Sequence, residues 1–370
     1  MPNVIDLFAG AGGLSLGAAR AGFKVSAAIE IDKQAAETHR KNFPATKHSN
    51  VDVSKLRGKE ILELARLRKG TLDGLIGGAP CQGFSVIGKR RQRDNRNSLF
   101  VDFFRLVDET RPKFFLTENV PNILTARYSC LRKRAFDKIR NQYVLIKPFA
   151  VKASDYGAPT RRTRIFFFGY DASAFSKELT AESFLPTHRT RPICVAEALL
   201  GLPVEISSEW LTEELGWQKA RAPKSNDFFN RVSDHIPDGV GHKKSVERFI
   251  EKNEVSGCMG TRHAKEVAER YRALAYGQRD CVSRSTKLDP NGFCPTLRSG
   301  TGSDKGRFQA VRPIHYDPPR VITPREAARL QGFPDWFVFH ETKWHSFRQI
   351  GNSVSPLVSE LLLKTICQHL

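Results

Sequence analysis

The stretch Val4-Ile5-Asp6-Leu7-Phe8-Ala9-Gly10-Ala11-Gly12-Gly13 joins a short apolar run to a turn that is rich in glycine. Apolar runs of this length are typical of buried strands. Helical spacing of apolar residues follows over residues 14–21 and ends at Gly22. Because glycine lacks a side chain, a ligand can approach the backbone of such a turn and the start of the helix behind it. The stretch therefore predicts a strand, a ligand-binding turn and a helix in succession.

Strands and helices are predicted to alternate through the first third of the chain. Apolar runs of strand length recur at residues 25–29, 72–76 and 114–117, and a helical pattern ends near Asn42. This alternation is typical of an α/β fold with a doubly wound, mostly parallel sheet. Residues 143–151 and 164–169 predict an antiparallel strand pair, which we expect at one edge of that sheet.

The alternation stops near residue 170, and prolines and polar clusters dominate from there to residue 311. We therefore predict a sheet domain at residues 1–170, a smaller inserted domain at 171–311 and a return to the sheet domain at 312–370. Thr323-Pro324-Arg325-Glu326 is typical of a helix start, because threonine caps the helix and glutamate completes a capping box. A turn at Gly351-Asn352-Ser353 and a final helix over 354–367, packed back on the sheet domain, are also predicted.

The charge and composition of the chain indicate which kinds of partner it binds. The 370 residues include 59 Lys and Arg against 39 Asp and Glu, a net charge of +20, which favours a polyanionic partner. We expect phosphate-facing residues in the inserted domain, although a single surface charge is usually only solvated. The basic residues of that region include Arg189, Arg191, Lys219, Arg221, Lys224, Lys243, Lys244, Arg248, Lys252, Arg262 and Lys265.

Other classes of protein are excluded or disfavoured. The hydrophobic fraction of 40% and the 25 Phe residues are too high for a disordered chain. No apolar run approaches the ~20 residues that cross a bilayer, so we expect no membrane partner. The seven cysteines form no C-x-x-C pair, which indicates neither a metal site nor a disulfide framework. The first residues lack the pattern of a secretory signal, and we expect a cytoplasmic protein.

The glycine turn and two acidic residues predict a nucleoside site. The turn differs from the dinucleotide fingerprint, because the third glycine of G-x-G-x-x-G would fall on Ser15. Glu30 ends the second strand, where an acidic side chain commonly binds ribose hydroxyls, and Asp52 follows a third short strand. The simpler interpretation is a tight turn with two exposed carboxylates.

A thiol, a carboxyl group and two arginines follow other strands. Cys81 lies in Gly78-Ala79-Pro80-Cys81-Gln82-Gly83, after the strand at 72–76, and a basic stretch at 88–93 could close over a phosphate backbone. Glu118 follows the strand at 114–117. Arg162 and Arg164 are expected to share one strand face, because side chains alternate along a strand. Cys81 and Glu118 could therefore meet at the carboxyl edge of the sheet.

In this order, six motifs together resemble the cytosine-carbon-5 DNA methyltransferases. They are D-L-F-A-G-A-G-G at 6–13, G-A-P-C-Q-G-F-S at 78–85, E-N-V at 118–120, R-R-T-R at 161–164, R-E-A-A-R-L-Q-G-F-P at 325–334 and Q-I-G-N-S-V-S-P at 349–356. The resemblance covers residues 1 to about 170 and about 290 to 370, and it implies an S-adenosylmethionine-binding sheet domain with an inserted target-recognition domain. Thr160 departs from it, since the family usually has glutamine there, which leaves the local hydrogen bonding open.

The resemblance also implies roles for individual residues. Glu30 binds the ribose of the cofactor, Ile31 packs on the adenine and Asp52 bonds the adenine amino group. The full set implied for the cofactor is Phe8, Ala9, Gly10, Gly12, Gly13, Leu14, Glu30, Ile31, Asp52, Pro80, Leu99, Asn352 and Ser353. The set implied for DNA is Ser85, Lys89, Arg90 and Arg91.

The catalytic chemistry follows from the poor nucleophilicity of carbon 5 of cytosine. A thiolate that adds to carbon 6 makes the ring an enamine, and cysteine suits this step near neutral pH. We expect Cys81 as nucleophile, Glu118 as the acid at ring nitrogen 3, Arg164 on the ring oxygen, and Arg162 with Ser85 on flanking phosphates. Because the carbon lies inside a duplex, the base must be swung out.

Three alternatives remain open at this point. The chain could be a tRNA methyltransferase of the same fold, or a catalytically silent DNA-binding homologue. A cysteine hydrolase would need a histidine beside Cys81, and none of the ten histidines is near it in sequence. We expect double-stranded DNA as the partner, a monomer, and a modification enzyme of a bacterial restriction-modification system whose cognate endonuclease acts on the same site. The recognised DNA sequence cannot be read from the chain.

Overall fold

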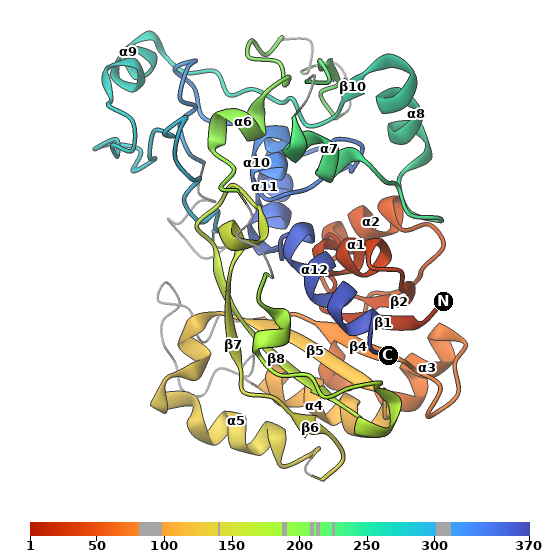
Figure 1. The fold of residues 1–370 in the computed structure, drawn as a ribbon. Coiled ribbons are helices and arrows are strands. Elements are labelled where there is room, and N and C mark those ends of the chain that lie inside the picture. The colour runs from red at the N-terminus through yellow and green to blue at the C-terminus, as the bar shows by residue number, and fades with distance from the viewer. Residues whose placement is uncertain are drawn as a thin grey trace.

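The computed structural model describes residues 1–80, 98–139, 141–186, 191–207, 211, 215–223, 226–300 and 312–370. Its centre is an eight-stranded sheet with the order β3-β2-β1-β4-β5-β8-β6, in which β7 also pairs with β8 (Figure 1). The strands are β1 Asn3–Leu7, β2 Lys24–Ile29, β3 Lys47–Ser49, β4 Gly74–Gly77, β5 Phe114–Asn119, β6 Val144–Leu145, β7 Phe149–Lys152 and β8 Thr163–Tyr170. The first five strands are parallel and β8 is antiparallel to β5, which confirms the predicted mostly parallel α/β sheet.

Helices cover both faces of this sheet. Those of the first half are α1 Gly13–Arg20, α2 Lys33–Asn42, α3 Gly58–Ala65, α4 Ser98–Thr110 and α5 Ser129–Phe136. Successive strand residues are buried on opposite sides, with Val4 and Phe114 in one apolar cluster and Ile5 and Phe115 in the other. Each strand is thus apolar on both faces, as a sheet that is covered on both sides requires.

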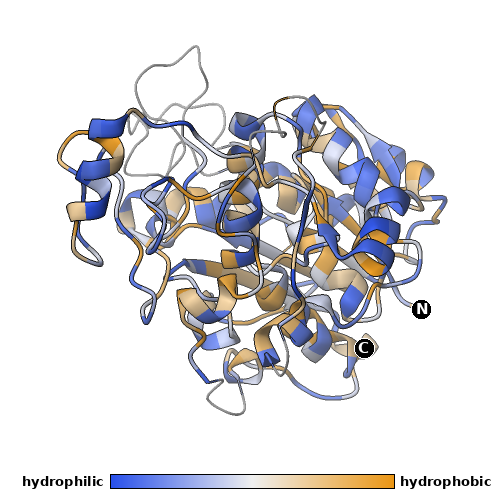
Figure 2. Cartoon of the chain, turned by 90° about the horizontal axis from the view of Figure 1, so that it is seen from above, coloured by the Kyte–Doolittle hydropathy of each residue, from blue (hydrophilic) through white to orange (hydrophobic). Residues whose placement is uncertain are grey.

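Shorter elements follow the sheet. They are α6 Val195–Leu199, β9 Gln218–Lys219, α7 Asp227–Ser233, α8 Lys243–Lys252, β10 Glu254–Val255 and α9 Lys265–Ala273. Seen from above, hydrophobic segments run through the middle of the molecule and hydrophilic ones lie towards the outside (Figure 2). Phe175 and Phe184 still pack on Phe168 of β8, so the chain just beyond residue 170 stays against the sheet.

The C-terminal segment forms α10 Pro324–Leu330, α11 Lys343–Asn352 and α12 Pro356–Cys367. The predicted capping box is present, because Thr323 and Glu326 bond each other's backbone N–H groups. The last helix, α12, lies next to α1 near the beginning of the chain (Figure 1). Its Ser359 hydroxyl donates to the Gly13 carbonyl over 2.9 Å, which confirms that the final helix packs back on the first strand-helix unit.

The predicted antiparallel pairing of residues 143–151 with 164–169 is confirmed, but the first segment forms two short strands, β6 and β7, which both pair with β8. The predicted turn at Gly351-Asn352-Ser353 was wrong. Gly351 and Asn352 are the last residues of α11 and do not form a turn. A Cβ atom on Gly351 would lie 2.7 Å from the Ser299 nitrogen, so glycine is needed there for close packing and not for a turn.

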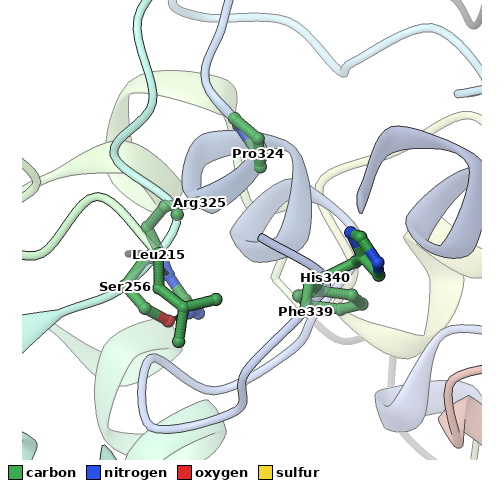
Figure 3. Close-up of a pocket in the computed structure, with 7 residues that line it drawn as sticks. Leu215, Ser256, Pro324, Arg325, Phe339 and His340 are labelled. Carbon is green, nitrogen blue, oxygen red and sulfur yellow. Dashed lines mark hydrogen bonds between the residues drawn. The ribbon is translucent and has the colours of Figure 1, made fainter. Parts of the chain in front are cut away.

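Arg325 connects α10 to the segment before α9. Its guanidinium donates to the carbonyls of Ser256, Pro334 and Phe337 and to the Ser256 hydroxyl. Figure 3 shows Arg325 and Ser256 side by side at the edge of a cavity of about 10 Å³, which is no larger than one water molecule. This pocket is therefore a packing gap around a structural arginine and not a ligand site.

Among the described residues, the basic residues expected to face phosphates lie on several elements, including β9, α8 and α9. Arg189 and Lys224 lie outside the described residues. The Gly241 N–H donates to the carbonyl of Asn42 at the end of α2, which places α8 near the amino edge of the sheet. In Figure 1, α8 lies above α2 on the right and α9 lies on the opposite side of the molecule. Lys243 begins α8 and Lys265 begins α9, so these two basic residues lie on different helices. Among the described residues, no helix is long and apolar enough to cross a membrane.

Candidate active site

The glycine turn between β1 and α1 has an unusual backbone. Phe8, Gly10 and Gly12 have φ angles of 59°, 56° and 104°. Phe8 is the only one of the three with a side chain, and such left-handed residues are held by surrounding structure and gather at ligand sites. A Cβ atom on Gly10 would meet nothing within 4 Å, whereas one on Gly12 would lie 2.4 Å from Phe43. The space beside Gly12 is thus filled by the Phe43 ring, whereas the space beside Gly10 is open to a ligand.

Glu30 connects the glycine turn to the end of β2. Its carboxylate accepts hydrogen bonds from the backbone N–H groups of Gly10 and Asp32, both over 2.8 Å. Burial raises the pKa of Glu30, and these two hydrogen bonds oppose the shift. Next to it, the apolar Ile31 side chain is 61% exposed. Open backbone, an acidic group and an exposed apolar side chain fit the ribose and adenine of a nucleoside cofactor.

The other residues expected at the cofactor differ in their position relative to this turn and in their exposure. A Cβ atom on Gly13 would lie 3.2 Å from the Ser353 side chain and 2.3 Å from the Val354 carbonyl oxygen, so the C-terminal segment closes against the turn. Asn352 is exposed there. Asp52 caps the short helix Val53–Lys55 through the Ser54 N–H. Ala9 and Leu14 are buried, and Pro80 and Leu99 are half-buried.

The carboxyl end of β5 carries an ion pair. Glu118 Oε1 lies 2.5 Å from Nε of Arg164 at the start of β8, and only 8% of Glu118 is exposed. A Cβ atom on Gly78 would lie 3.3 Å from the Glu118 carboxylate. The Asn119 amide donates to the Ala79 carbonyl over 3.4 Å. The loop that leads from β4 towards residue 81 is therefore held against the acid at the carboxyl edge.

Arg162 requires a correction. We expected it to contact a phosphate, but its side chain is buried, with 3% exposure. Its guanidinium donates to the carbonyls of Leu297, Gly351 and Asn352 over 3.2, 2.9 and 3.4 Å. Arg162 precedes β8 and turns inward because these carbonyls at and near the end of α11 need donors. Nearby, Thr160, which departs from the resemblance, is buried, and its hydroxyl donates to the Cys294 carbonyl over 3.3 Å.

Five expected site residues lie outside the described residues. They are Cys81, Ser85, Lys89, Arg90 and Arg91. The six described cysteines are free thiols, and burial raises the pKa of the Cys258 thiol to about 12. Within the described part of the chain, no group of three or more acidic, histidine or cysteine side chains is placed to hold a metal.

Sequence reasoning missed residues that support the site. Asn119 was seen only as part of a motif, and its bond to Ala79 depends on two strands that are distant in sequence. Asp6 and His39 were not singled out, yet both are fully buried beside the glycine turn and linked through Ser15. Asp6 offered a signal, since a charged residue inside an apolar strand needs a reason.

The chain is similar to known methyltransferases along nearly its whole length. The model of the C-5 cytosine-specific DNA methylase family matches residues 2–368. The type II methyltransferase M.XorII of Xanthomonas oryzae is 40% identical over 97% of this chain and 82% of its own length. M.DdeI of Desulfomicrobium norvegicum is 31% identical over 98% of this chain and 88% of its own length.

A crystal structure of a protein described as a DNA modification methyltransferase, encoded within a prophage (E. coli), superimposes with a TM-score of 0.89. It is 50% identical, and the match covers 99% of this chain and 98% of that one. These matches agree with the turn, the acid-arginine pair and the order of motifs found in the chain itself. The chain belongs to the C-5 cytosine-specific DNA methylase family.

Proposed function

We propose that this DNA (cytosine-5-)-methyltransferase acts on a cytosine swung out of duplex DNA, with Cys81 as nucleophile and Glu118 and Arg164 as the groups that activate the ring. The ion pair between Glu118 and Arg164 carries the proposal, because it lies beside Gly78, three residues before Cys81. An acid, a guanidinium and the approach to a thiol at one sheet edge are the groups that an unreactive pyrimidine carbon needs.

Cys81, Glu118 and Arg164 each have one task in activating the cytosine ring. The Cys81 thiolate forms a bond to carbon 6, and Glu118 gives a proton to ring nitrogen 3, so carbon 5 becomes nucleophilic as an enamine carbon. Arg164 donates to the ring oxygen and holds Glu118 in place. After carbon 5 has gained the methyl group, a base removes the carbon-5 proton, and the electron pair re-forms the ring double bond and expels the thiolate. Ring nitrogen 3 returns its proton to Glu118.

S-adenosylmethionine is the cofactor, and it supplies a methyl group activated by a sulfonium. The residues that fit it are the open backbone at Gly10, the Glu30 carboxylate for the ribose and the exposed Ile31 side chain for the adenine. Phe8, Gly12, Gly13, Asp52, Asn352 and Ser353 would complete this site, and Ala9, Leu14, Pro80 and Leu99 would line it. The residues that would hold the cofactor and those that would bind the base then lie at the same carboxyl edge of the sheet.

The DNA partner is proposed to contact both the loop after Cys81 and residues 171–311, which we assign to target recognition. Ser85, Lys89, Arg90 and Arg91 would contact the phosphates beside the flipped base. The relatives named above are type II methyltransferases, which supports a role as the modification enzyme of a bacterial restriction-modification system with a cognate endonuclease. We further propose a cytoplasmic monomer, which size-exclusion chromatography with light scattering would check.

Bisulfite sequencing of DNA from cells that express this chain tests the proposal. We expect 5-methylcytosine at one short sequence, and no methylation with Cys81→Ser. The matched control is Cys130→Ser, which changes an exposed thiol in α5 and should methylate like the wild type.

Purified protein separates the alternatives. Transfer of labelled methyl groups to tRNA and not to DNA would overturn the DNA assignment, and wild-type activity of Cys81→Ser would overturn the nucleophile. No transfer to any DNA, with cofactor binding intact, would favour a catalytically silent homologue.

A further inference from the structure

Four polar side chains form one continuous hydrogen-bonded chain beside the glycine turn. Asp6 Oδ2 accepts from the Ser15 hydroxyl over 2.7 Å, and Ser15 Oγ lies 2.9 Å from Nε2 of His39. Nδ1 of His39 lies 2.8 Å from Nε2 of His48. Asp6, Ser15 and His39 are completely buried, whereas His48, in β3, is only half-buried. The chain therefore connects a buried carboxyl group to the molecular surface.

The positions of these residues tie the chain to the ligand-binding turn. Asp6 is in β1, two residues before Phe8, and Ser15 is in the first turn of α1 behind the turn. Their hydrogen bond therefore spans the base of the glycine turn. His39 also stacks on Phe43, the side chain that fills the space below Gly12. A change at Asp6 would thus occur directly below the backbone that we assign to the cofactor.

The hydrogen bonds of this chain can run in two directions. When the Asp6 carboxyl is protonated, it donates to Ser15, Ser15 donates to His39, and the His39 Nδ1 proton points at His48. When Asp6 is ionised, each of these bonds is reversed, and His48 donates inward from Nε2. Both arrangements satisfy the three hydrogen bonds that join these four side chains, and they differ by one proton.

That proton can leave without water entering the protein. The Asp6 proton passes to Ser15 Oγ as the Ser15 proton passes to His39 Nε2, the His39 Nδ1 proton passes to His48 Nε2, and the His48 Nδ1 proton leaves at the surface. Ser15, His39 and His48 each gain one proton and lose one, whereas Asp6 loses one and ends as a carboxylate. The reverse sequence returns the proton to Asp6.

Asp6 is placed so that a nearby positive charge would ionise it. Burial raises its pKa from 3.8 to about 7, the Ser15 bond lowers it, and the charge of Glu30 on β2 raises it. Among the described residues, its Oδ1 atom has no hydrogen-bond partner. The other charged groups that act on this chain are Arg40 and Glu37 of α2, which lie at its outer end near His48. None of them provides a positive charge at Asp6.

We propose that the Asp6-Ser15-His39-His48 chain is a proton path through which binding of the sulfonium cofactor ionises Asp6 and releases one proton at His48. S-adenosylmethionine carries one more positive charge than S-adenosylhomocysteine, its demethylated product. A buried carboxylate under the turn therefore favours the methyl donor over the product. The inference rests on the proposed function only for the place where the cofactor binds.

The pH dependence of binding follows from the linkage between ligand and proton. Asp6 is mainly protonated at pH 6 and mainly ionised at pH 8, so the fraction competent to attract the cation rises about tenfold. Affinity for S-adenosylmethionine should therefore rise about tenfold over this range relative to affinity for S-adenosylhomocysteine. Both ligands share the same amino-acid end and the same contacts with Glu30, so their ratio isolates the sulfonium charge.

Isothermal titration calorimetry of the wild-type protein without DNA tests the proposal. Titrations at pH 6.5 in buffers of different ionisation enthalpy give the number of protons released. We expect about half a proton or more for S-adenosylmethionine and far less for S-adenosylhomocysteine. Equal proton counts for the two ligands, or a constant affinity ratio from pH 6 to 8, would overturn the inference.

Variants and spectroscopy test the path itself. Asp6→Asn donates to Ser15 as the protonated acid does, so it should remove the difference in proton release between the two ligands. Asp108→Asn, at a surface carboxylate that pairs with Arg111, is the matched control and should behave like the wild type. Because Asp6→Asn could fold poorly, ¹⁵N NMR of the wild-type histidines gives a second readout.

The NMR readout is the tautomer of His39, which should change from the Nδ1–H to the Nε2–H form when S-adenosylmethionine binds. An unchanged His39 tautomer with bound cofactor would overturn the proton path. If neither ligand binds at all, the proposed function fails instead, so the two failures are distinguishable.

Discussion

Glu118 and Arg164 show how much of the proposed chemistry depends on single side chains. Their 2.5 Å contact joins two strands that are more than 40 residues apart in sequence, and both side chains are largely buried. Replacing one member of a buried ion pair is destabilising, because its partner would stay buried without compensation. Since we assign both residues to the cytosine ring and neither to the cofactor, substitutions here should also affect methyl transfer more than cofactor binding.

Glu118→Gln keeps the shape of the side chain but removes its acid. We expect the rate of methyl transfer in single turnovers on duplex DNA to fall about 10²–10⁴-fold, the usual contribution of a positioned acid. Calorimetric affinity for S-adenosylmethionine should stay within about twofold. Glu63→Gln, in an exposed pair with Lys59, is the control and should react like the wild type. A Glu118→Gln rate equal to that of the control would contradict the assignment.

The raised pKa of Asp6 also predicts how stability depends on pH. Between pH 3.8 and about 7 the folded protein keeps a proton that the unfolded chain has lost, so Asp6 makes stability fall as pH rises. Burial lowers the pKa of His48 to about 4, which acts in the opposite direction from pH 4 to 6.5. Asp6→Asn removes only the first effect. Urea unfolding should therefore show Asp6→Asn gaining stability relative to the wild type from pH 5 to pH 8, and a constant difference would refute this.

At the scale of elements, close contacts between segments distant in sequence hold the site together. α12 reaches back to α1 at the glycine turn, and Arg162 before β8 binds the end of α11. Both contacts join the C-terminal segment to the first half of the chain. The cofactor site and the catalytic edge should therefore lose their shape together if either contact is broken.

Gly17→Ala tests the contact of α1 with α12. A Cβ atom there would lie 2.0 Å from Ser359 Oγ and 2.5 Å from the Glu360 nitrogen. Helix propensity alone favours alanine by about 1 kcal/mol, but overpacking costs about 1–3 kcal/mol, and the Glu360 backbone cannot move aside alone. We expect a net loss of stability of up to about 2 kcal/mol in urea unfolding. Ala19→Ser on the same helix is the control, and a stabilised Gly17→Ala would show that α12 adjusts freely.

Arg162→Lys tests the second contact. Lysine cannot reach the three carbonyls that the guanidinium bonds, so we expect a loss of about 2–3 kcal/mol in unfolding free energy. Its exposed neighbour gives a matched control, since Arg161→Lys should change stability by less than about 0.5 kcal/mol. Equal stabilities of the two variants would mean that the buried hydrogen bonds of Arg162 contribute nothing.

At the scale of the whole molecule, the positive charge is distributed over more than one face. β1 begins near the labelled N-terminus at the right of Figure 1, so the carboxyl ends of the parallel strands point to the left. α9 lies on that left side, whereas α8 lies above α2 near the amino edge. In this view α9 therefore lies on the same side as the carboxyl ends of the parallel strands.

DNA binding at several salt concentrations tests this division. Replacing Arg262 and Lys265 together by alanine should weaken duplex binding and reduce the slope of log K against log salt by about 2, because each lost phosphate contact removes about 0.9. Replacing Lys243 and Lys252 together by alanine removes the same charge from α8 and should leave the slope unchanged. Equal effects of the two double variants would show that the net charge of +20 acts as a whole.

Patterns of residues that are close together in the sequence were sufficient to predict several helices and strands and the family. The apolar runs, the glycine turn and the Thr323–Glu326 capping box depend on neighbours in the chain, so β1, β2, α1 and α10 could be predicted close to their observed bounds. The order of the short motifs was sufficient to indicate the methyltransferase family. Residues 143–151 were harder, because the break between β6 and β7 depends on how β8 pairs with each.

The sequence by itself determined an α/β sheet, a nucleoside-binding turn and the residue types of a pyrimidine methyltransferase, because these follow from local patterns and from motif order. Only the tertiary structure decided that Arg162 points inward, that Gly351 serves close packing and that Asp6, Ser15, His39 and His48 form one chain. The physical reason is that hydrogen-bond partners and steric neighbours of a buried side chain come from distant segments, and their spacing is set only when those segments pack.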